Sequence, residues 1–237
     1  MIIYVVIAVV LLAIGAVLII VGRNKGGLKS EIGSMPTTSI KDLKDGQYAE
    51  IKGVASCDHP LRVPGSDMPS VYYSYEVKRH EHHTDSSGHT SSSWHTVDKG
   101  SSRVPFRLTD STGTVVIDPQ DAEFDAPKVV DRRMGPEEDL SQGVLRTAVK
   151  AATLLMGIDQ KIEAHAVTTD RDLYVLGNVQ RGPDNTPRIV KGDKKFFIST
   201  KSEEQLSGSL GRQSIIYYAI GGVLAVGAIV VLVAGLM

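Results

Sequence analysis

Two long apolar runs without a charged residue, one near each end of the chain, constrain this protein more than any other feature. The first covers residues 2–22 and the second covers residues 215–237. At ~1.5 Å rise per residue, each run forms a helix of roughly 30 Å, which matches the hydrocarbon core of a bilayer. Such a helix satisfies its own backbone hydrogen bonds inside the bilayer. We therefore predict a two-pass membrane protein in which the polar residues between the runs form a domain outside the bilayer.

Both predicted membrane helices connect to this polar domain from the same side of the membrane, so we expect the domain to lie close to the bilayer surface. The predicted order is a transmembrane helix at 2–22, a linker at 23–39, a β domain at 40–206, a linker at 207–214 and a transmembrane helix at 215–237.

Basic residues next to the two runs predict the orientation. Arg23, Lys25 and Lys29 follow the first run and Arg212 precedes the second, whereas the short terminal tails carry no Lys or Arg. Because positive charges are enriched on the cytoplasmic side, we predict a cytoplasmic domain and both termini on the outer side.

Composition excludes several classes of function. The net charge is −1 and no long basic stripe is present, so nucleic acid is not an expected partner. Cys57 is the single cysteine, which excludes an internal disulfide and a cysteine-based zinc cage. The chain also lacks the phosphate-binding, dinucleotide-binding, zinc-protease and serine-hydrolase motifs.

The polar region has the pattern of a mainly β domain. Residues 71–79 alternate cleanly, and residues 104–117 form a hairpin pattern in which Gly113 is expected to supply the positive φ of the turn. One accessory helix is predicted over 135–157, which Gly135-Pro136 opens. Short strands with Gly-rich turns favour a barrel-like or sandwich fold. Further strands are predicted at 48–55, 93–97, 162–167, 172–180, 188–191 and 196–199.

A histidine-rich segment is the clearest candidate for metal chemistry. The histidines are His80, His82, His83, His89 and His95. Imidazoles at this density can bind zinc or another divalent metal, or sense pH. On a strand, however, His83 faces away from His80 and His82, and ordering a Ser-rich tip would cost about 1–2 kcal/mol per residue. We favour a solvated hairpin tip over 80–92 and predict no cofactor, with metal binding as the alternative.

Two further groups are candidate contact sites. Tyr72 and Trp94 lie on alternating strands, where aromatic side chains belong either to the core or to a partner-binding surface. Gly221 and Ala225 form a small-xxx-small pair in the second run, which would let another helix approach closely. That helix is either the first run of the same chain or a second copy.

Several short motifs, taken in order, resemble one family. They are Gly53-Val-Ala, Pro60-Leu, Val71-Tyr-Tyr-x-Tyr-Glu-Val77, Trp94, Val104-Pro-Phe-x-Leu-x-Asp-x-x-Gly113, Val116-Ile-Asp-Pro119, Glu163-x-His-Ala, Asp172-Leu-Tyr-Val-Leu-Gly-Asn-Val179 and Phe196-Phe-Ile-Ser199. Together with the flanking apolar runs they resemble the beside-a-membrane domain of the MULAN/GIDE family.

The resemblance implies a link to protein ubiquitination. Eukaryotic members are mitochondrial outer-membrane ubiquitin ligases whose catalytic competence resides in a zinc-binding RING finger after the second membrane helix. This sequence stops at Met237 and has one cysteine, so we expect a RING-less, prokaryotic-type member that is not an enzyme by itself.

The expected function is therefore a membrane-anchored protein-interaction or scaffold module. Its expected partners are the lipid bilayer and a membrane or membrane-associated protein, which includes a second copy of the chain. One alternative is a component of a RING-type ubiquitin-protein ligase system with the RING on another chain. A second alternative is a metal or pH sensor based on the histidines.

Overall fold

The chain divides into two compact units in a computed structural model, which describes residues 2–84, 87–134, 159–182 and 185–236. One unit combines Met1–Pro36 with Lys201–Met237, and the other is Thr37–Thr200. The predicted helix over 135–157 lies outside the described residues.

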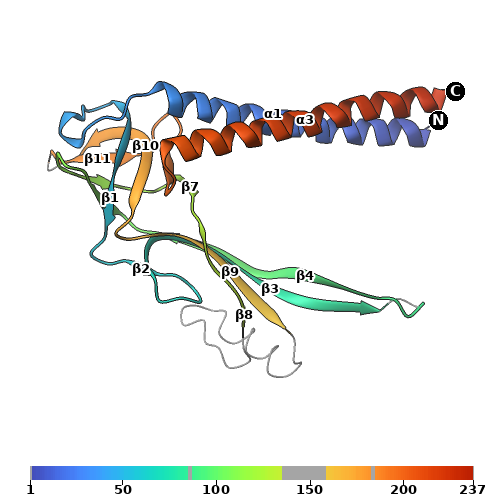
Figure 1. The fold of residues 1–237 in the computed structure, drawn as a ribbon, viewed down its shortest axis with the longest axis horizontal. Helices are drawn as coiled ribbons and strands as arrows, with labels where there is room; N and C mark the ends of the chain where they lie inside the picture. Colours follow the sequence, from blue (N-terminus) through green and yellow to red (C-terminus); the bar gives the residue numbers. More distant parts are fainter. Residues whose placement is uncertain (1, 85–86, 135–158, 183–184, 237) are drawn as a thin grey trace. The chain divides into compact units, whose positions relative to one another are not determined.

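The first unit is a pair of helices, α1 (Ile2–Ser34) and α3 (Glu203–Leu236), which run antiparallel side by side (Figure 1). Both helices are long and apolar enough to cross a membrane. They confirm the prediction of a membrane protein with two candidate spans.

Both helices extend further than the apolar runs. α1 continues to Ser34, into the predicted linker at 23–39, and α3 begins at Glu203 rather than at residue 215. A capping box explains this early start, because Gln205 N donates to Ser202 Oγ (3.4 Å) while Ser202 N donates to Gln205 Oε1 (3.3 Å). Packing between the helices supports the polar ends as well, with Gly26 of α1 against Ser214 of α3.

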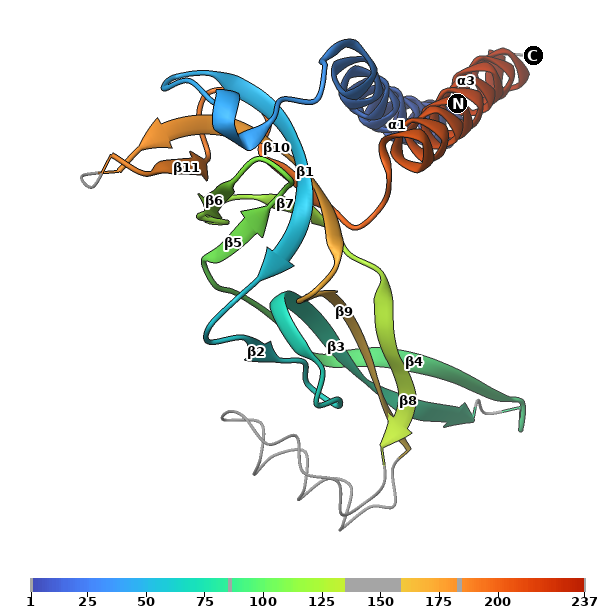
Figure 2. The same ribbon diagram turned by 60° about the vertical axis from the view of Figure 1, so that its left-hand side comes forward.

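The second unit contains a small barrel. Its strands are β1 (Tyr48–Ser56), β5 (Phe106–Thr109), β6 (Thr114–Ile117), β11 (Pro187–Val190) and β10 (Asp172–Arg181), and β10 pairs back with β1 to close the ring (Figure 2). The β6–β11 pair is parallel and the other four pairs are antiparallel. This ring confirms the predicted mainly β, barrel-like fold, and it resembles the five-stranded barrel of the OB-fold.

Two short strands add to the barrel at β10: β12 (Phe197–Ser199), and β7 (Glu123–Asp125), which pairs with β12 in parallel. Alternate side chains of the barrel strands fill its interior, where Ile51, Leu108 and Ile189 are fully buried. Gly177 of β10 has to be a glycine, because an added Cβ would lie 2.5 Å from Ile189 Cγ2.

A second sheet has the order β4–β3–β9–β8, with β2 beside the beginning of β3. A second apolar cluster, which includes Val77 and Ile162, covers one face of this sheet. The register between β3 and β4 shifts at Val77/Lys78, which marks a β-bulge. The strands are β2 (Leu61–Arg62), β3 (Pro69–Thr84), β4 (Thr90–Arg103), β8 (Lys128–Met134) and β9 (Gln160–Thr168).

Two local predictions are wrong. Residues 80–84 and 90–92 are strand rather than a hairpin tip, because the β3–β4 ladder continues to the pair Thr84↔Thr90. Gly113 does not have a positive φ. The turn is held instead by the Asp110 carboxylate, whose Oδ1 accepts hydrogen bonds from Thr112 N (2.6 Å) and Gly113 N (2.9 Å).

Candidate functional site

One face of the second sheet is charged, and alternation along the strands produces it. The side chains of Ser74, Glu76 and Lys78 point away from the face that Val77 occupies. The register with β9 places Glu163 beside Glu76 and Lys161 beside Lys78. We call this surface the charged face; its members are Glu76, Lys78, Lys99, Lys161, Glu163 and His165.

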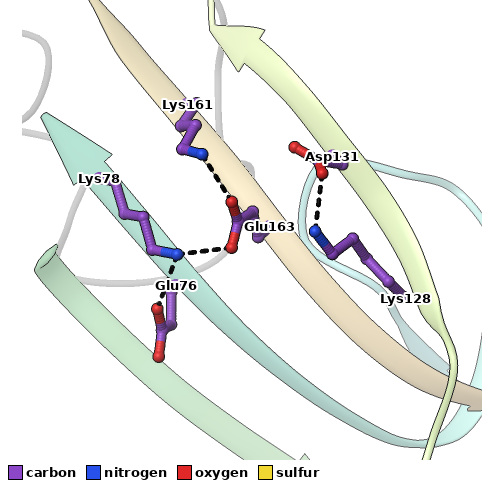
Figure 3. A network of polar contacts seen from close by, with 6 residues as sticks. All are labelled: Glu76, Lys78, Lys128, Asp131, Lys161 and Glu163. Carbon is purple, nitrogen blue, oxygen red and sulfur yellow. Dashed lines mark hydrogen bonds and ion pairs between the residues drawn. The ribbon is translucent and has the colours of Figure 1, made fainter. Parts of the chain in front are cut away.

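Glu163 is the centre of an ion-pair network on this face (Figure 3). Its Oε2 lies 2.5 Å from Lys78 Nζ and its Oε1 lies 2.7 Å from Lys161 Nζ. Lys78 Nζ is also 3.3 Å from Oε2 of Glu76. The hydrogen bonds from Lys161 and then from Lys78 lower the pKa of Glu163 to about 2, and the bond to Glu163 raises the pKa of Lys78. Glu163 and Lys78 are therefore both charged at neutral pH.

A neighbouring pair on β8 extends the charges across the sheet. Lys128 Nζ lies 2.7 Å from Asp131 Oδ2, and this hydrogen bond raises the pKa of Lys128. Figure 3 shows this pair beside the Glu163 network with no dashed contact between the two.

An open groove of about 630 Å³ lies along β3, β4 and β9. Its polar side chains come from three strands, with Ser74 and Glu76 on β3, Lys99 on β4 and His165 on β9, so the groove depends on the strand pairing. Within the part of the chain that the structure describes, Lys99 has no ion pair. The lining residues are Tyr72, Ser74, Tyr75, Glu76, Lys99, Gly100, Ser101, Glu163 and His165.

Trp94 lies further out on the same face, in the part of the hairpin that extends past β9. The rings of His80 and Trp94 stack at 4.7 Å between centroids, and Lys161 Nζ lies 5.0 Å from the centroid of the Trp94 ring. Trp94 is half-buried in this stack rather than in a core. An amphipathic ring that is held by a cation and an imidazole is typical of a contact surface.

The histidines do not come together as one cluster. The His80 and His82 rings meet edge to face at 4.4 Å, but His95 Nε2 lies 2.7 Å from Ser93 Oγ, and His89 is exposed. Among the described residues, no three His, Cys, Asp or Glu side chains could hold a metal ion. The side chain of His83 lies outside them, so metal binding stays a prediction.

Tyr72 lies at the junction of the two sheets. Its ring stacks on Phe124 of β7 at 3.8 Å between centroids and an interplanar angle of 2°. The Arg103 guanidinium lies over the ring of Phe124, 5.9 Å from its centroid. The ring of Tyr72 packs against the barrel core, and its role as a partner surface stays a prediction.

Gly221 and Ala225 face the first helix within the same chain. A Cβ on Gly15 would lie 3.1 Å from Gly221 O and 3.8 Å from Ala225 N. Ser214 adds a buried hydrogen bond of 2.9 Å from its Oγ to Gly22 O. Pairing with a second copy stays a prediction.

Sequence reasoning missed the Glu163 network. Lys78 and Glu163 are 85 positions apart, so no local spacing connects them. The available signal was alternation, which places charged residues at every second position of both strands.

A family model described as "GIDE: E3 Ubiquitin ligase" matches residues 75–234, which is more than half of the chain. The matched region includes β4, β9, most of α3 and all six residues of the charged face. No curated protein matches the chain.

Proposed function

Because this chain belongs to the GIDE family of ubiquitin-ligase-related proteins, we propose that it is a membrane-anchored protein-interaction module whose partner contacts the charged face and the outer β3–β4 hairpin. One observation carries the proposal. Within the described residues, the β3–β9 ladder ends at the pair Arg79↔Gln160, after which His80 N donates one more hydrogen bond to Asp159 O (2.9 Å). The β3–β4 ladder continues from there to Thr84↔Thr90 and carries the His80–Trp94 stack. Exposed elements on a rigid sheet commonly carry recognition.

The charges on this face favour binding over catalysis. A general acid or base works best with a pKa near the operating pH. Hydrogen bonds from Lys161 and Lys78 lower the pKa of Glu163 to about 2, far from neutral pH. Fixed, paired charges of this kind set the orientation and choice of a partner instead.

Anchoring at both ends determines where this interaction takes place. Two membrane spans hold the domain at the bilayer, which raises its effective concentration toward other membrane proteins.

We place the domain on the cytoplasmic side because Arg23, Lys25, Lys29 and Arg212 all flank the spans on the domain's side. A cysteine at the exposed position of Lys41, in a Cys57→Ser background, should react with a membrane-impermeant maleimide only after cells are permeabilised; labelling of intact cells would contradict this orientation.

Purification of the full chain from gently solubilised native membranes tests the proposal. Mass spectrometry should identify a co-purifying protein with the wild type and with Lys41→Ala, an exposed control in the barrel unit, but with much lower recovery for Trp94→Ala. If no protein rises above background with the wild type, the interaction function is wrong.

A second candidate is a component of a ubiquitin ligase system whose RING finger lies on another chain. The family description favours it, and the one cysteine in these 237 residues cannot supply the cysteine-rich zinc ligands of a RING. A RING protein or a ubiquitin-conjugating enzyme at near-stoichiometric amount would support this candidate. If the co-purifying protein is instead a different membrane protein, the result would support the scaffold role.

A further inference from the structure

β4 forms an edge of the second sheet. Across the described residues, its 14 residues pair with β3 alone, and no proline interrupts them. The edge of a sheet presents unpaired N–H and C=O groups, which can accept another strand.

The register shows which backbone groups face outward. Val104 N donates to Val71 O at 3.1 Å, and in an antiparallel pair the residues alternate between bonding their partner and pointing away from it. Gly100 and Ser102 therefore bond to β3. Lys99 and Ser101, both exposed, direct their N–H and C=O groups toward the open edge. The bulge at Val77/Lys78 ends this regular stretch.

The side chains beside this edge have a net positive charge. Glu76, which lies opposite Lys99, forms its ion pair with Lys78, while Glu163 pairs with Lys78 and Lys161. The negative charges of Glu76 and Glu163 are balanced by the positive charges of Lys78 and Lys161. The positive charge of Lys99 is therefore not balanced within this group. A strand added at β4 would direct alternate side chains toward the same groove, where an acidic side chain is favoured and a basic one is disfavoured.

A second copy that pairs through its own β4 edge does not supply this acid. Antiparallel pairing of two β4 edges about Ser101 would place Lys99 opposite Arg103, and pairing about Lys99 would place two lysines opposite each other. Pairing about Gly100 would place Lys99 opposite Ser101. Like charges in direct opposition are destabilising, and none of these β4–β4 registers gives Lys99 an acidic partner.

We infer that the β4 edge around Lys99 and Ser101 binds an extended segment of a partner protein by strand addition, and that an acidic side chain of this segment pairs with Lys99. Main-chain hydrogen bonds supply affinity and the charged face supplies selectivity. This inference rests on the proposed interaction function and names the chemistry of its partner.

A short labelled peptide of alternating threonine and glutamate is the probe. The full chain in lipid nanodiscs should bind it saturably by fluorescence anisotropy. Lys99→Glu should weaken binding about tenfold or more because it replaces an attraction with a repulsion. Ser101→Pro should abolish binding because it removes an outward N–H. That N–H makes no bond to β3, so the fold should survive, which circular dichroism checks. Lys41→Glu, an exposed charge reversal in the barrel unit, should bind as wild type does.

The same peptide with lysine in place of glutamate, or with alternate amides methylated, should not bind. Hydrogen exchange should show new protection at the amides of Lys99 and Ser101 on peptide binding. Binding that survives Ser101→Pro, or equal binding of the lysine peptide, would overturn the inference. Protection of the same amides that rises with protein concentration alone would assign the edge to a second copy. If the co-purifying partner is retained by both Lys99→Glu and Ser101→Pro, strand addition is wrong while the interaction function stands.

Discussion

The Tyr174 hydroxyl of β10 donates a 2.7 Å hydrogen bond to Oε2 of Glu50 on β1, whose carboxylate is fully buried. Thr37 Oγ1 donates to the other carboxylate oxygen at 2.7 Å, and Lys52 Nζ lies 3.4 Å from that same oxygen. Both oxygens of a buried anion are therefore satisfied. A buried charge is tolerated only under these conditions, so the three partners of Glu50 act as one unit.

We expect Tyr174→Phe to destabilise the protein by about 1–3 kcal/mol, because it leaves Glu50 Oε2 buried without a donor. Denaturant unfolding of the full chain in detergent, followed by circular dichroism, measures this change. Tyr48→Phe is the matched control, since it removes a 2.8 Å bond from Tyr48 Oη to Lys195 O at a half-buried site and should cost less. Equal losses for the two variants would contradict the special role of the buried carboxylate.

The burial of Glu50 and its contacts could not be predicted from the sequence. A glutamate in an alternating strand is expected to face solvent, and nothing near Glu50 in the sequence points to Tyr174, which is 124 positions away. The strands themselves were predictable because their period-2 pattern is local. The barrel closure was not, since it depends on the parallel β6–β11 pair between distant segments.

The candidate site was predictable to a similar extent. Alternation separated the apolar and polar faces of β3 and made Trp94 a candidate contact residue. It could not show that the ladder continues to Thr84, because a Ser-rich segment is typical of turns and loops. Nor could it show that Lys99 would be left without an ion pair to any described residue, since that depends on which lysines reach Glu163.

Acid stability should depend on Glu163. A carboxyl whose pKa falls from 4.5 to about 2 on folding contributes stability that is fully present above pH 4.5 and is lost as the pH falls toward 2. Glu163→Gln should remove this part of the pH dependence and also lower stability at pH 7, because Lys78 and Lys161 then lie close together without their anion. Unfolding curves between pH 7 and about 2 test this prediction. A wild-type-like pH profile for Glu163→Gln would refute it, while Asp67→Asn, at an exposed ion pair, should leave the profile unchanged.

Tyr75 should titrate later than an ordinary tyrosine. Burial is the main cause and a hydrogen bond to Asp98 the second cause that raise the pKa of its phenol to about 12. Asp98→Asn should lower this pKa but keep it above 10, because burial remains. NMR of ¹³C-labelled tyrosine during an alkaline titration follows the phenol directly. If Asp98→Asn leaves the midpoint unchanged, the carboxylate does not act on Tyr75.

Close packing of the two membrane helices depends on Gly221 but not on Gly222. A Cβ at Gly221 would lie 2.8 Å from Ile19 Cγ1 and 3.0 Å from Gly15 O, whereas a Cβ at Gly222 would meet nothing within 4 Å. Gly221→Leu should therefore separate α1 from α3, and Gly222→Leu, which adds the same side chain one position further along, should not. Gly235 packs against the Tyr4 side chain, so cysteines introduced at these two positions in a Cys57→Ser background report on the helix contact. In nanodiscs, they should form a disulfide with high yield in the parent and in the Gly222→Leu variant. The yield should be low in the Gly221→Leu variant. Equal yields in the two leucine variants would show that the pair does not rely on this close approach.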